Sequence, residues 1–301
     1  MKVRIGYGLG TRSLTNDAGR FAAFVDALEG CGFDSLWLSE RITGDCPDPL
    51  IGLAVAAGRT KKLKLGTSVQ VLPGRNPVLL AKEWASLDRL SNGRTLPAFG
   101  LGVADPREQQ AFGVARGERA KWFDEALPLI RRLWTEDSVD HDGERFHYEA
   151  VSVRPKPVQQ PPDVWLGGLA PSELRRIGRL GDGWLPSFCT PADIERSRPA
   201  IEAAASDAGR ELDSEHWGAL VAYTDGPIPD LVAAAIAARR PDLEKPSDVI
   251  ASGIDGLRDR LEGFVAAGAS KFVVVPLTEP DDWDAALSQV GEALLPMQKA
   301  A

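Results

Sequence analysis

The feature that most constrains the fold is a strand–helix–strand pattern in residues 63–103. Two apolar runs, Leu63–Val71 and Leu96–Val103, enclose a stretch in which apolar side chains recur every three or four residues. That interval is typical of a helix with one buried face, and short apolar runs bounded by Gly and Pro are typical of buried strands. Two strands joined by a crossover helix form a parallel pair, so the segment predicts a parallel α/β sheet.

The same alternation recurs along most of the chain, in about eight strand–helix units, the number that closes a (β/α)8 barrel. We therefore expect an α/β fold, a (β/α)8 TIM barrel with insertion segments, as a single domain over residues 1–301. An open parallel sheet is the alternative, but no G-x-G-x-x-G follows the first strand, which speaks against its nucleotide-binding version. The expected strands are residues 3–9, 35–39, 63–71, 96–103, 164–167, 184–188, 216–223 and 271–276.

Two segments interrupt this alternation. Residues 137–160 are polar, contain Asp142-Gly143 as a turn signal and end in prolines, which predicts a hairpin-like excursion. Residues 227–253 contain several prolines and are expected to form an irregular segment with one helical piece at 230–239. Loops after the strands, including residues 106–110 and 227–253, are expected to line the substrate pocket.

Composition excludes several classes of partner. The 43 acidic against 35 basic residues give a formal charge of −8, which argues against nucleic acid. No apolar run reaches the ~18 residues of a membrane span, and the N-terminus enters a strand without a signal-peptide pattern. Three scattered cysteines favour reduced thiols in the cytoplasm, and the three histidines have no metal-ligand spacing, so no metal site is expected.

Small residues interrupt two neighbouring strands. Gly66-Thr67-Ser68 lies inside the third expected strand, and Gly100, Gly102 and Ala104 lie toward the end of the fourth. A small residue in a strand marks a bulge, tight packing or a ligand that approaches the backbone. Because ligands of parallel α/β folds bind at the C-terminal ends of the strands, ligand contact and packing are both retained as interpretations.

Several short motifs gain specificity from their order and spacing. They are FDSLWLSER (33–41), LGTSVQVLPGRNP (65–77), LDRLSNGR (87–94), FGLGV (99–103), AFGV with Arg119 after it (111–119), LW (133–134), RPKPVQQPP (154–162), WLGG (165–168) and RLGDGW (179–184). Together they resemble the luciferase-like flavin and deazaflavin oxidoreductases, especially those that use coenzyme F420, over nearly the whole chain. The resemblance implies a barrel with an isoalloxazine-type ring across its C-terminal mouth.

The resemblance also implies where the cofactor is held. A non-prolyl cis peptide in the third strand supports the ring, and the loop after the fourth strand lines the polar edge of the ring. A glycine pair and the start of the next helix receive the phosphate, since helix N-terminal N–H groups suit an anion. The matching cofactor-binding positions are Ser68, Val69, Val71, Val103, Ala104, Asp105, Gly167, Gly168 and Ser172. Arg175 and Arg176 either add charge to the phosphate site or form solvated helix surface.

The end of the second strand departs from the family pattern. Where related dehydrogenases have an acid followed by a catalytic histidine, this chain has Glu40-Arg41. Arginine stays protonated and cannot shuttle a proton near neutral pH, so the histidine mechanism cannot be carried over. Arg41 either holds a substrate oxygen or polarises the ring, or forms a surface pair with Glu40 or Asp45. Glu40 is a candidate hydrogen-bond acceptor, or a base if burial raises its pKa.

These observations predict an enzyme, an oxidoreductase that moves a hydride between coenzyme F420 and a small organic substrate, with Glu40 and Arg41 as catalytic candidates. An FMN-dependent monooxygenase on the same scaffold is the first alternative. A non-catalytic F420- or flavin-binding protein is the second. The expected partner is a small molecule, not nucleic acid or membrane, and a homodimer is retained as the assembly to test. The sequence does not name the substrate.

Overall fold

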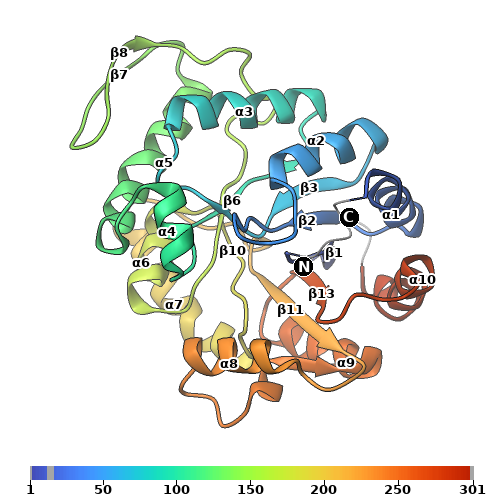
Figure 1. The fold of residues 1–301 in the computed structure, drawn as a ribbon. Helices are drawn as coiled ribbons and strands as arrows, with labels where there is room; N and C mark the ends of the chain where they lie inside the picture. Colours follow the sequence, from blue (N-terminus) through green and yellow to red (C-terminus); the bar gives the residue numbers. More distant parts are fainter. Residues whose placement is uncertain (1, 12–16, 299–301) are drawn as a thin grey trace. The chain divides into compact units, whose positions relative to one another are not determined.

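The computed structural model (Figure 1) describes residues 2–11 and 17–298. The chain divides into two compact units. Unit 1 consists of Met1–Gly10, Ala23–Trp37 and Leu166–Ala301. Unit 2 consists of Thr11–Ala22 and Leu38–Trp165. Within each unit strands alternate with helices, as the sequence predicts.

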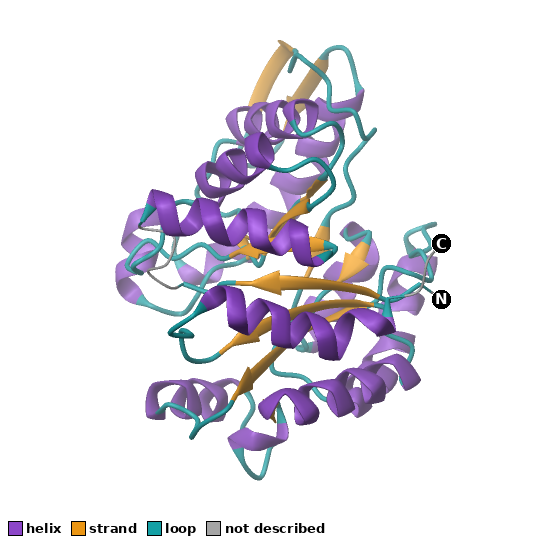
Figure 2. Cartoon of the chain, turned by 90° about the vertical axis from the view of Figure 1, so that its right-hand side faces the viewer, coloured by secondary structure: helices purple, strands orange, loops and turns teal. Residues whose placement is uncertain are grey.

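Unit 1 is built around a parallel sheet with the strand order β12-β11-β13-β1-β2. Its central strand, β13, has the sequence KFVVVP and is buried along its whole length, as expected of an apolar strand covered on both faces. The elements are β1 (Arg4–Gly8), α1 (Ala18–Cys31, in part), β2 (Ser35–Leu38, in part), the end of β9 (Trp165–Leu166), α6 (Pro171–Leu180), β10 (Gly183–Trp184), α7 (Pro191–Asp207), β11 (Gly218–Thr224), α8 (Asp230–Arg239), β12 (Ile250–Ser252), α9 (Gly253–Ala266), β13 (Lys271–Pro276) and α10 (Trp283–Leu294), with 3-10 turns at Pro246–Asp248 and Leu295–Met297. Strand β13 pairs parallel with both β1 and β11, and Figure 2 draws the strands as arrows along the chain direction.

Unit 2 contains two strands that are each broken into two pieces. Residues Lys64–Thr67 (β3) pair with Thr95–Leu96 (β5), and Gln70–Val71 (β4) pair with Ala98–Gly100 (β6). Ser68 and Val69 separate the first two pieces, which confirms the interruption predicted from the small residues there. Pro97 separates the other two pieces, because proline has no N–H for the ladder.

The helices of unit 2 begin at predictable residues. Pro49–Arg59 (α2) and Pro77–Leu90 (α3) each have proline in the first turn, preceded by Asp48 and Asn76, whose side chains accept the first free N–H groups. Asp105 and Pro106 repeat this pattern and start a further helix, α4 (Pro106–Phe112). The expectation of a loop at residues 106–110 is therefore wrong. After a 3-10 turn at Arg116–Glu118, Arg119–Thr135 forms the long helix α5.

The polar excursion is the predicted hairpin. Strands Val139–Asp142 (β7) and His147–Val151 (β8) pair antiparallel and extend beyond α3 and α5 (Figure 1). Glu125 on α5 fastens its turn, because its carboxylate accepts the backbone N–H groups of Arg145 and Phe146 and contacts His141 Nε2 at 3.0 Å. The second interrupting segment, residues 227–253, contains the predicted helix as α8 (Asp230–Arg239). The short strand β12 after this helix was not expected.

Candidate cofactor and active site

The break in the third strand lies at Ser68 and Val69. The Ser68–Val69 peptide bond is cis, as predicted. Two hydrogen bonds join Ser68 to the end of β2 and to the residue after it. Ser68 N–H donates to Leu38 O at 2.8 Å, and Ser39 Oγ donates to Ser68 O at 2.9 Å. A side chain at Gly100 would put its Cβ 2.5 Å from Val69 Cγ2, so glycine is needed there for close packing.

Glu40 supports the same segment. Its side chain is only 3% exposed, and one carboxylate oxygen accepts Val71 N–H at 2.7 Å while the other is paired with Arg75. Arg75 also donates from Nε to Val71 O at 2.9 Å, so the acid and the base bind the N–H and the C=O of the same residue. Burial raises the pKa of Glu40, and the Arg75 charge and the Val71 N–H oppose that shift. Both oxygens of Glu40 are therefore occupied in this arrangement.

Arg41 joins the loop after β2 to the start of α4. Its Nη2 lies 3.2 Å from Asp105 Oδ2, and its Nε lies 3.1 Å from Glu108 Oε1. These carboxylates replace the Glu40 or Asp45 partner considered from the sequence. The Arg41 side chain is 32% exposed, and Nη1 has no partner among the residues that the structure describes.

Glu108 is the centre of that connection. It is 3% exposed and accepts Ile42 N–H at 3.2 Å, Thr43 N–H at 2.9 Å and Thr43 Oγ–H at 2.7 Å. Burial acts to raise the pKa of Glu108, but these donors together with Arg41 outweigh it and lower the pKa. The Arg107 hydrogen bonds lower the pKa of Asp105 to about 2, so both carboxylates beside Arg41 are charged at neutral pH.

The loop of residues 101–105, after the fourth strand, turns its carbonyls inward. Arg119 Nη1 donates to Leu101 O at 3.1 Å and to Val103 O at 2.9 Å, with Gly102 between them at φ +81°. The N–H groups of residues 101–104 form no hydrogen bond within residues 2–11 and 17–298. Successive N–H groups around a left-handed residue are an arrangement that receives electron-rich oxygen.

Arg119 itself is an unusual buried cation. It is 4% exposed, burial lowers its pKa, and it has no carboxylate partner in the described part of the chain. Its Nη2 is buried and forms no hydrogen bond. A buried cation with a free donor under a loop of free N–H groups can receive an electron-rich oxygen, which suits the polar edge of a ring that gains electrons.

In the predicted phosphate segment of unit 1, two backbone N–H groups already have an acceptor within the chain. The Glu173 carboxylate accepts the N–H groups of Leu169 and Ala170 at 3.0 and 2.9 Å, so the helix supplies its own anion. Gly168 has φ +109°, and a Cβ there would meet Glu173 Oε2 at 2.4 Å. Gly168 is thus required by the local backbone, and replacing it would disturb the cap as well as any bound anion. Ser172 is exposed on the first turn of α6.

The structure assigns structural roles to residues that sequence reasoning missed: Arg75, Glu108, Arg119 and Glu173. For Glu108 a signal was present, because Asp105 and Glu108 have the spacing of a capping box. Arg75 and Arg119 were part of the quoted motifs but had no local pattern that indicates a role. Nothing in the described residues groups three or more potential metal-ligating side chains. None of the helices between residues 17 and 298 is long and apolar enough to cross a membrane.

Comparison with known proteins identifies the class. The fold matches, with a TM-score of 0.82 and 20% identity over 100% of both chains, an F420-dependent secondary alcohol dehydrogenase solved with an F420-acetone adduct. It also matches the FMN complex of the oxygenating constituent of a 3,6-diketocamphane monooxygenase from Pseudomonas putida, with a TM-score of 0.76 and 17% identity over 98% and 99% of the two chains. The chain has the (β/α)8 barrel fold predicted from its sequence.

The family follows from the sequence match. Residues 2–241 match the family described as luciferase-like monooxygenase, and the chain belongs to this family. It is 30% identical to the F420-dependent glucose-6-phosphate dehydrogenase of Kineococcus radiotolerans over 204 residues, which are 64% of this chain and 60% of that protein. The match thus spans about three fifths of the length of that curated relative, and 59% of its counterpart from Gordonia bronchialis.

Proposed function

We propose that the protein is an F420-dependent oxidoreductase that transfers a hydride between the deazaflavin and a small organic substrate. The observation that carries the proposal is the 101–105 loop, where free N–H groups lie above the buried Arg119 cation. The two curated relatives named above are F420-dependent glucose-6-phosphate dehydrogenases, which supports the choice of cofactor. When bound, the deazaflavin supplies the hydride chemistry, and the protein supplies binding, orientation and shielding from water.

The proposed cofactor residues have separate tasks. Ser68, Val69 and Val71 form the support for the ring, and Val103, Ala104 and Asp105 belong to the loop that meets its polar edge. Glu40 and Arg75 fix the backbone of Val71, and Arg119 fixes the carbonyls of Leu101 and Val103. Such preorganisation lowers the entropy cost of binding. Gly167, Gly168 and Ser172 are the proposed phosphate positions.

Arg41 is the proposed catalytic residue. Asp105 and Glu108 fix its guanidinium, and Nη1 keeps its donor capacity for a substrate oxygen. A fixed cation stabilises negative charge on a carbonyl or alkoxide oxygen while the hydride moves. Glu40 is held by two donors, so we propose that its part in the reaction is exerted through the segment that it supports, as a positioning residue.

Spectroscopic titration with both cofactors tests the proposed function. We expect F420 absorbance and fluorescence to change on binding, with F420 reduced or oxidised when a substrate is supplied. The FMN-dependent monooxygenase is the competing function, and a purified protein that retains flavin absorbance and ignores F420 would support it. Binding without turnover across a substrate panel would support the non-catalytic alternative.

Replacing Arg41 gives a prediction on turnover. Arg41→Ala should lower kcat at least about tenfold, since one charged hydrogen bond in the transition state is worth roughly 1.5–3 kcal/mol. Arg41→His should not restore activity, because a neutral imidazole lacks the fixed charge. No limb of the pH–rate profile should disappear, because the variant removes no acid or base that exchanges protons near neutral pH. Unchanged kinetics in a folded variant would contradict the catalytic role.

We also propose that the protein is a cytoplasmic homodimer that uses α2. The outer face of this helix carries Ile51, Ala54, Val55 and Gly58, all exposed, with Ile51 64% and Val55 47% exposed. No acidic residue lies on α2, although the chain has a net charge of −8. Two copies can therefore approach through this face without the repulsion that acidic surfaces impose. Three cysteines without a disulfide bond agree with a reducing compartment.

Negative charges placed on the outer face of α2 test the proposed homodimer. The Ile51→Glu, Val55→Glu double variant should be monomeric in size-exclusion chromatography with light scattering, where the parent is a dimer. Leu231→Glu, at an 87% exposed position on α8, is the matched control and should leave the dimer intact. A monomeric parent, or a double variant that remains a dimer, would count against this interface.

A further inference from the structure

The positive charge of Arg41 is balanced within the chain. Its Nη2 lies 3.2 Å from Asp105 Oδ2 and its Nε lies 3.1 Å from Glu108 Oε1. Asp105 also pairs with Arg107, whose Nη2 lies 2.9 Å from Asp105 Oδ2. We call Arg41, Asp105, Arg107 and Glu108 the Arg41 cluster. It contains two arginines and two carboxylates, so its formal charges cancel.

The loop that follows Arg41 also contains its own anion. The backbone N–H groups of Ile42 and Thr43 both donate to the Glu108 carboxylate, and so does Thr43 Oγ. Two successive backbone N–H groups form the kind of site that can receive a phosphate or carboxylate oxygen. Because Glu108 already occupies them, an anionic group of a substrate would meet a buried carboxylate at this loop in place of free donors.

The donors that Arg41 has left suit a single oxygen atom. Recognition of a carboxylate by arginine uses two parallel hydrogen bonds from two nitrogens. Nε and Nη2 of Arg41 each hold an acid of the chain, so a substrate carboxylate would have to share a nitrogen with Asp105 or Glu108. Those two carboxylates would also repel it across short distances. One carbonyl or hydroxyl oxygen needs only Nη1, and no negative charge is brought in.

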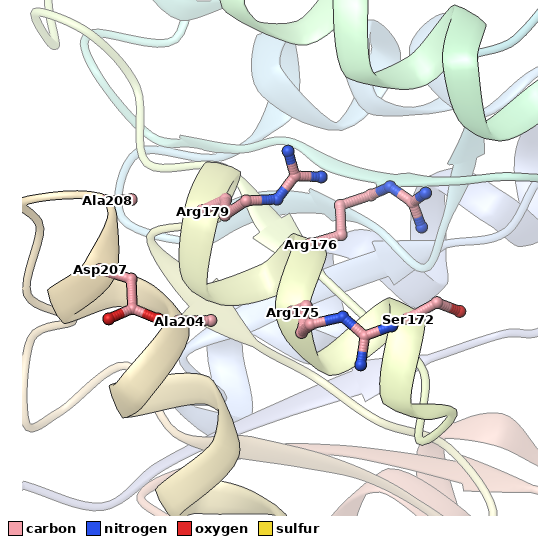
Figure 3. A pocket seen from close by; sticks show the side chains of 7 residues that line it. All are labelled: Ser172, Arg175, Arg176, Arg179, Ala204, Asp207 and Ala208. Atoms are coloured by element: carbon pink, nitrogen blue, oxygen red, sulfur yellow. The ribbon is translucent and has the colours of Figure 1, made fainter.

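The arginines of α6, in unit 1, have different surroundings. Figure 3 shows Arg175, Arg176 and Arg179 along one side of a cavity of about 440 Å³, which Asp207 also lines. That lining contains three arginines and one carboxylate. In the Arg41 cluster arginines and carboxylates are equal in number, so the presence of an arginine there does not by itself indicate an anionic ligand.

We propose that the Arg41 cluster selects a substrate whose reacting carbonyl or hydroxyl group has no anionic group beside it, and that Asp105 and Glu108 exclude 2-oxo and 2-hydroxy acids. The inference rests on the proposed function, with Arg41 at the reacting oxygen. In the direction of reduction, the carbonyl carbon takes the hydride of the reduced deazaflavin and the carbonyl oxygen takes a proton from water, which gives an alcohol. Arg41 Nη1 donates to that oxygen as negative charge develops on it.

A 2-oxo acid and its methyl ester test this selection, because the two compounds differ by one charge close to the reacting carbon. With reduced F420, the parent should have a kcat/KM for the ester that exceeds the value for the acid at least about tenfold. Asp105→Asn removes one negative charge and keeps a residue that caps α4 well. In this variant the acid-to-ester ratio of kcat/KM should rise about three- to thirtyfold.

The comparison of ratios isolates the charge. Both substrates react with the same cofactor, so a change in cofactor binding cancels, and the intrinsic reactivity of acid and ester is the same for parent and variant. Asp142→Asn, at a 95% exposed position on β7, is the control for loss of a carboxylate elsewhere in unit 2 and should keep the ratio of the parent. An acid-to-ester ratio that is equal in the parent and in Asp105→Asn would overturn the inference.

A second measurement needs no cofactor. The Nε–H resonance of Arg41 is followed by NMR in protein with 15N-labelled arginine, and Arg41→Lys identifies it. Inorganic phosphate should leave this resonance in place in the parent and shift it in Asp105→Asn. A parent resonance that moves with phosphate as it does in the variant would show that the cluster admits anions.

The two measurements separate the inference from the proposed function. If no carbonyl compound is reduced with F420, the proposed function fails, and the phosphate titration still decides whether the cluster excludes anions. If reduced F420 reduces the 2-oxo acid as efficiently as its ester, the function stands and the exclusion fails.

Discussion

Arg119→Met is expected to weaken cofactor binding by at least about tenfold while changing thermal stability little. Arg119 Nη1 holds the carbonyls of Leu101 and Val103, and without it the 101–105 loop loses the orientation of its free N–H groups. A hydrogen bond from a charged group is worth about 1.5–3 kcal/mol, and about 1.4 kcal/mol corresponds to tenfold in affinity. Two effects on stability oppose each other, because the variant loses two hydrogen bonds but no longer buries an unpaired charge.

Arg116→Met is the matched control, since Arg116 is exposed and lies one turn before Arg119. Arg119→Lys should give an intermediate affinity, because lysine keeps the charge but not the planar fork. Dissociation constants from fluorescence titration and melting temperatures from calorimetry measure both quantities. A folded Arg119→Met variant that binds F420 as tightly as the parent would show that the loop needs no such support.

Glu108→Gln is expected to cost about 2–3 kcal/mol in the free energy of unfolding at neutral pH. Glutamine replaces one acceptor oxygen by a donor that would face the N–H groups of Ile42 or Thr43. The pKa of Glu108 is lowered in the folded state, so its stabilising contribution is present above the ordinary value and is lost as pH falls through the folded value. The gap between parent and variant should therefore close in acid.

Glu40→Gln is a control because the pKa of Glu40 shifts in the opposite direction to that of Glu108. Burial raises the pKa of Glu40 above the ordinary 4.5, so the folded state binds the proton more tightly than the unfolded state. The contribution of this titration to stability falls as pH rises through the window between the ordinary and the folded value. Relative to the parent, Glu40→Gln should gain stability as pH rises through that window. Chemical denaturation across pH measures both variants, and parallel curves for the two would contradict these assignments.

Most of the fold could be predicted from hydrophobic periodicity and from the positions of glycine and proline. Helix α8 (Asp230–Arg239) and strand β13 (Lys271–Pro276) have the predicted bounds, because prolines and an apolar run mark their ends. The other expected strands lie within a few residues of their predicted positions. The exceptions are α4 and β12, which are short, so hydrophobic periodicity has few residues in which to show.

The candidate site was less predictable, since its order comes from contacts between distant segments. Glu40 and Arg75 are 35 residues apart, and Arg41 and Asp105 are 64 apart, so no local pattern connects them. The sequence could indicate that Arg41 is no proton shuttle, because that follows from its chemistry alone. It could not indicate that two carboxylates would fix Arg41, or that Glu173 would occupy the start of α6. Those facts depend on folded geometry.

The way in which the 101–105 loop is built has a consequence for how such a protein evolves. In the loop the proposed ligand contacts are peptide N–H groups, and nearly any substitution leaves a peptide N–H in place. Recognition of the ring can therefore persist while the side chains around it change. Descendants of this chain could exchange one cofactor for another of the same ring type before losing the fold.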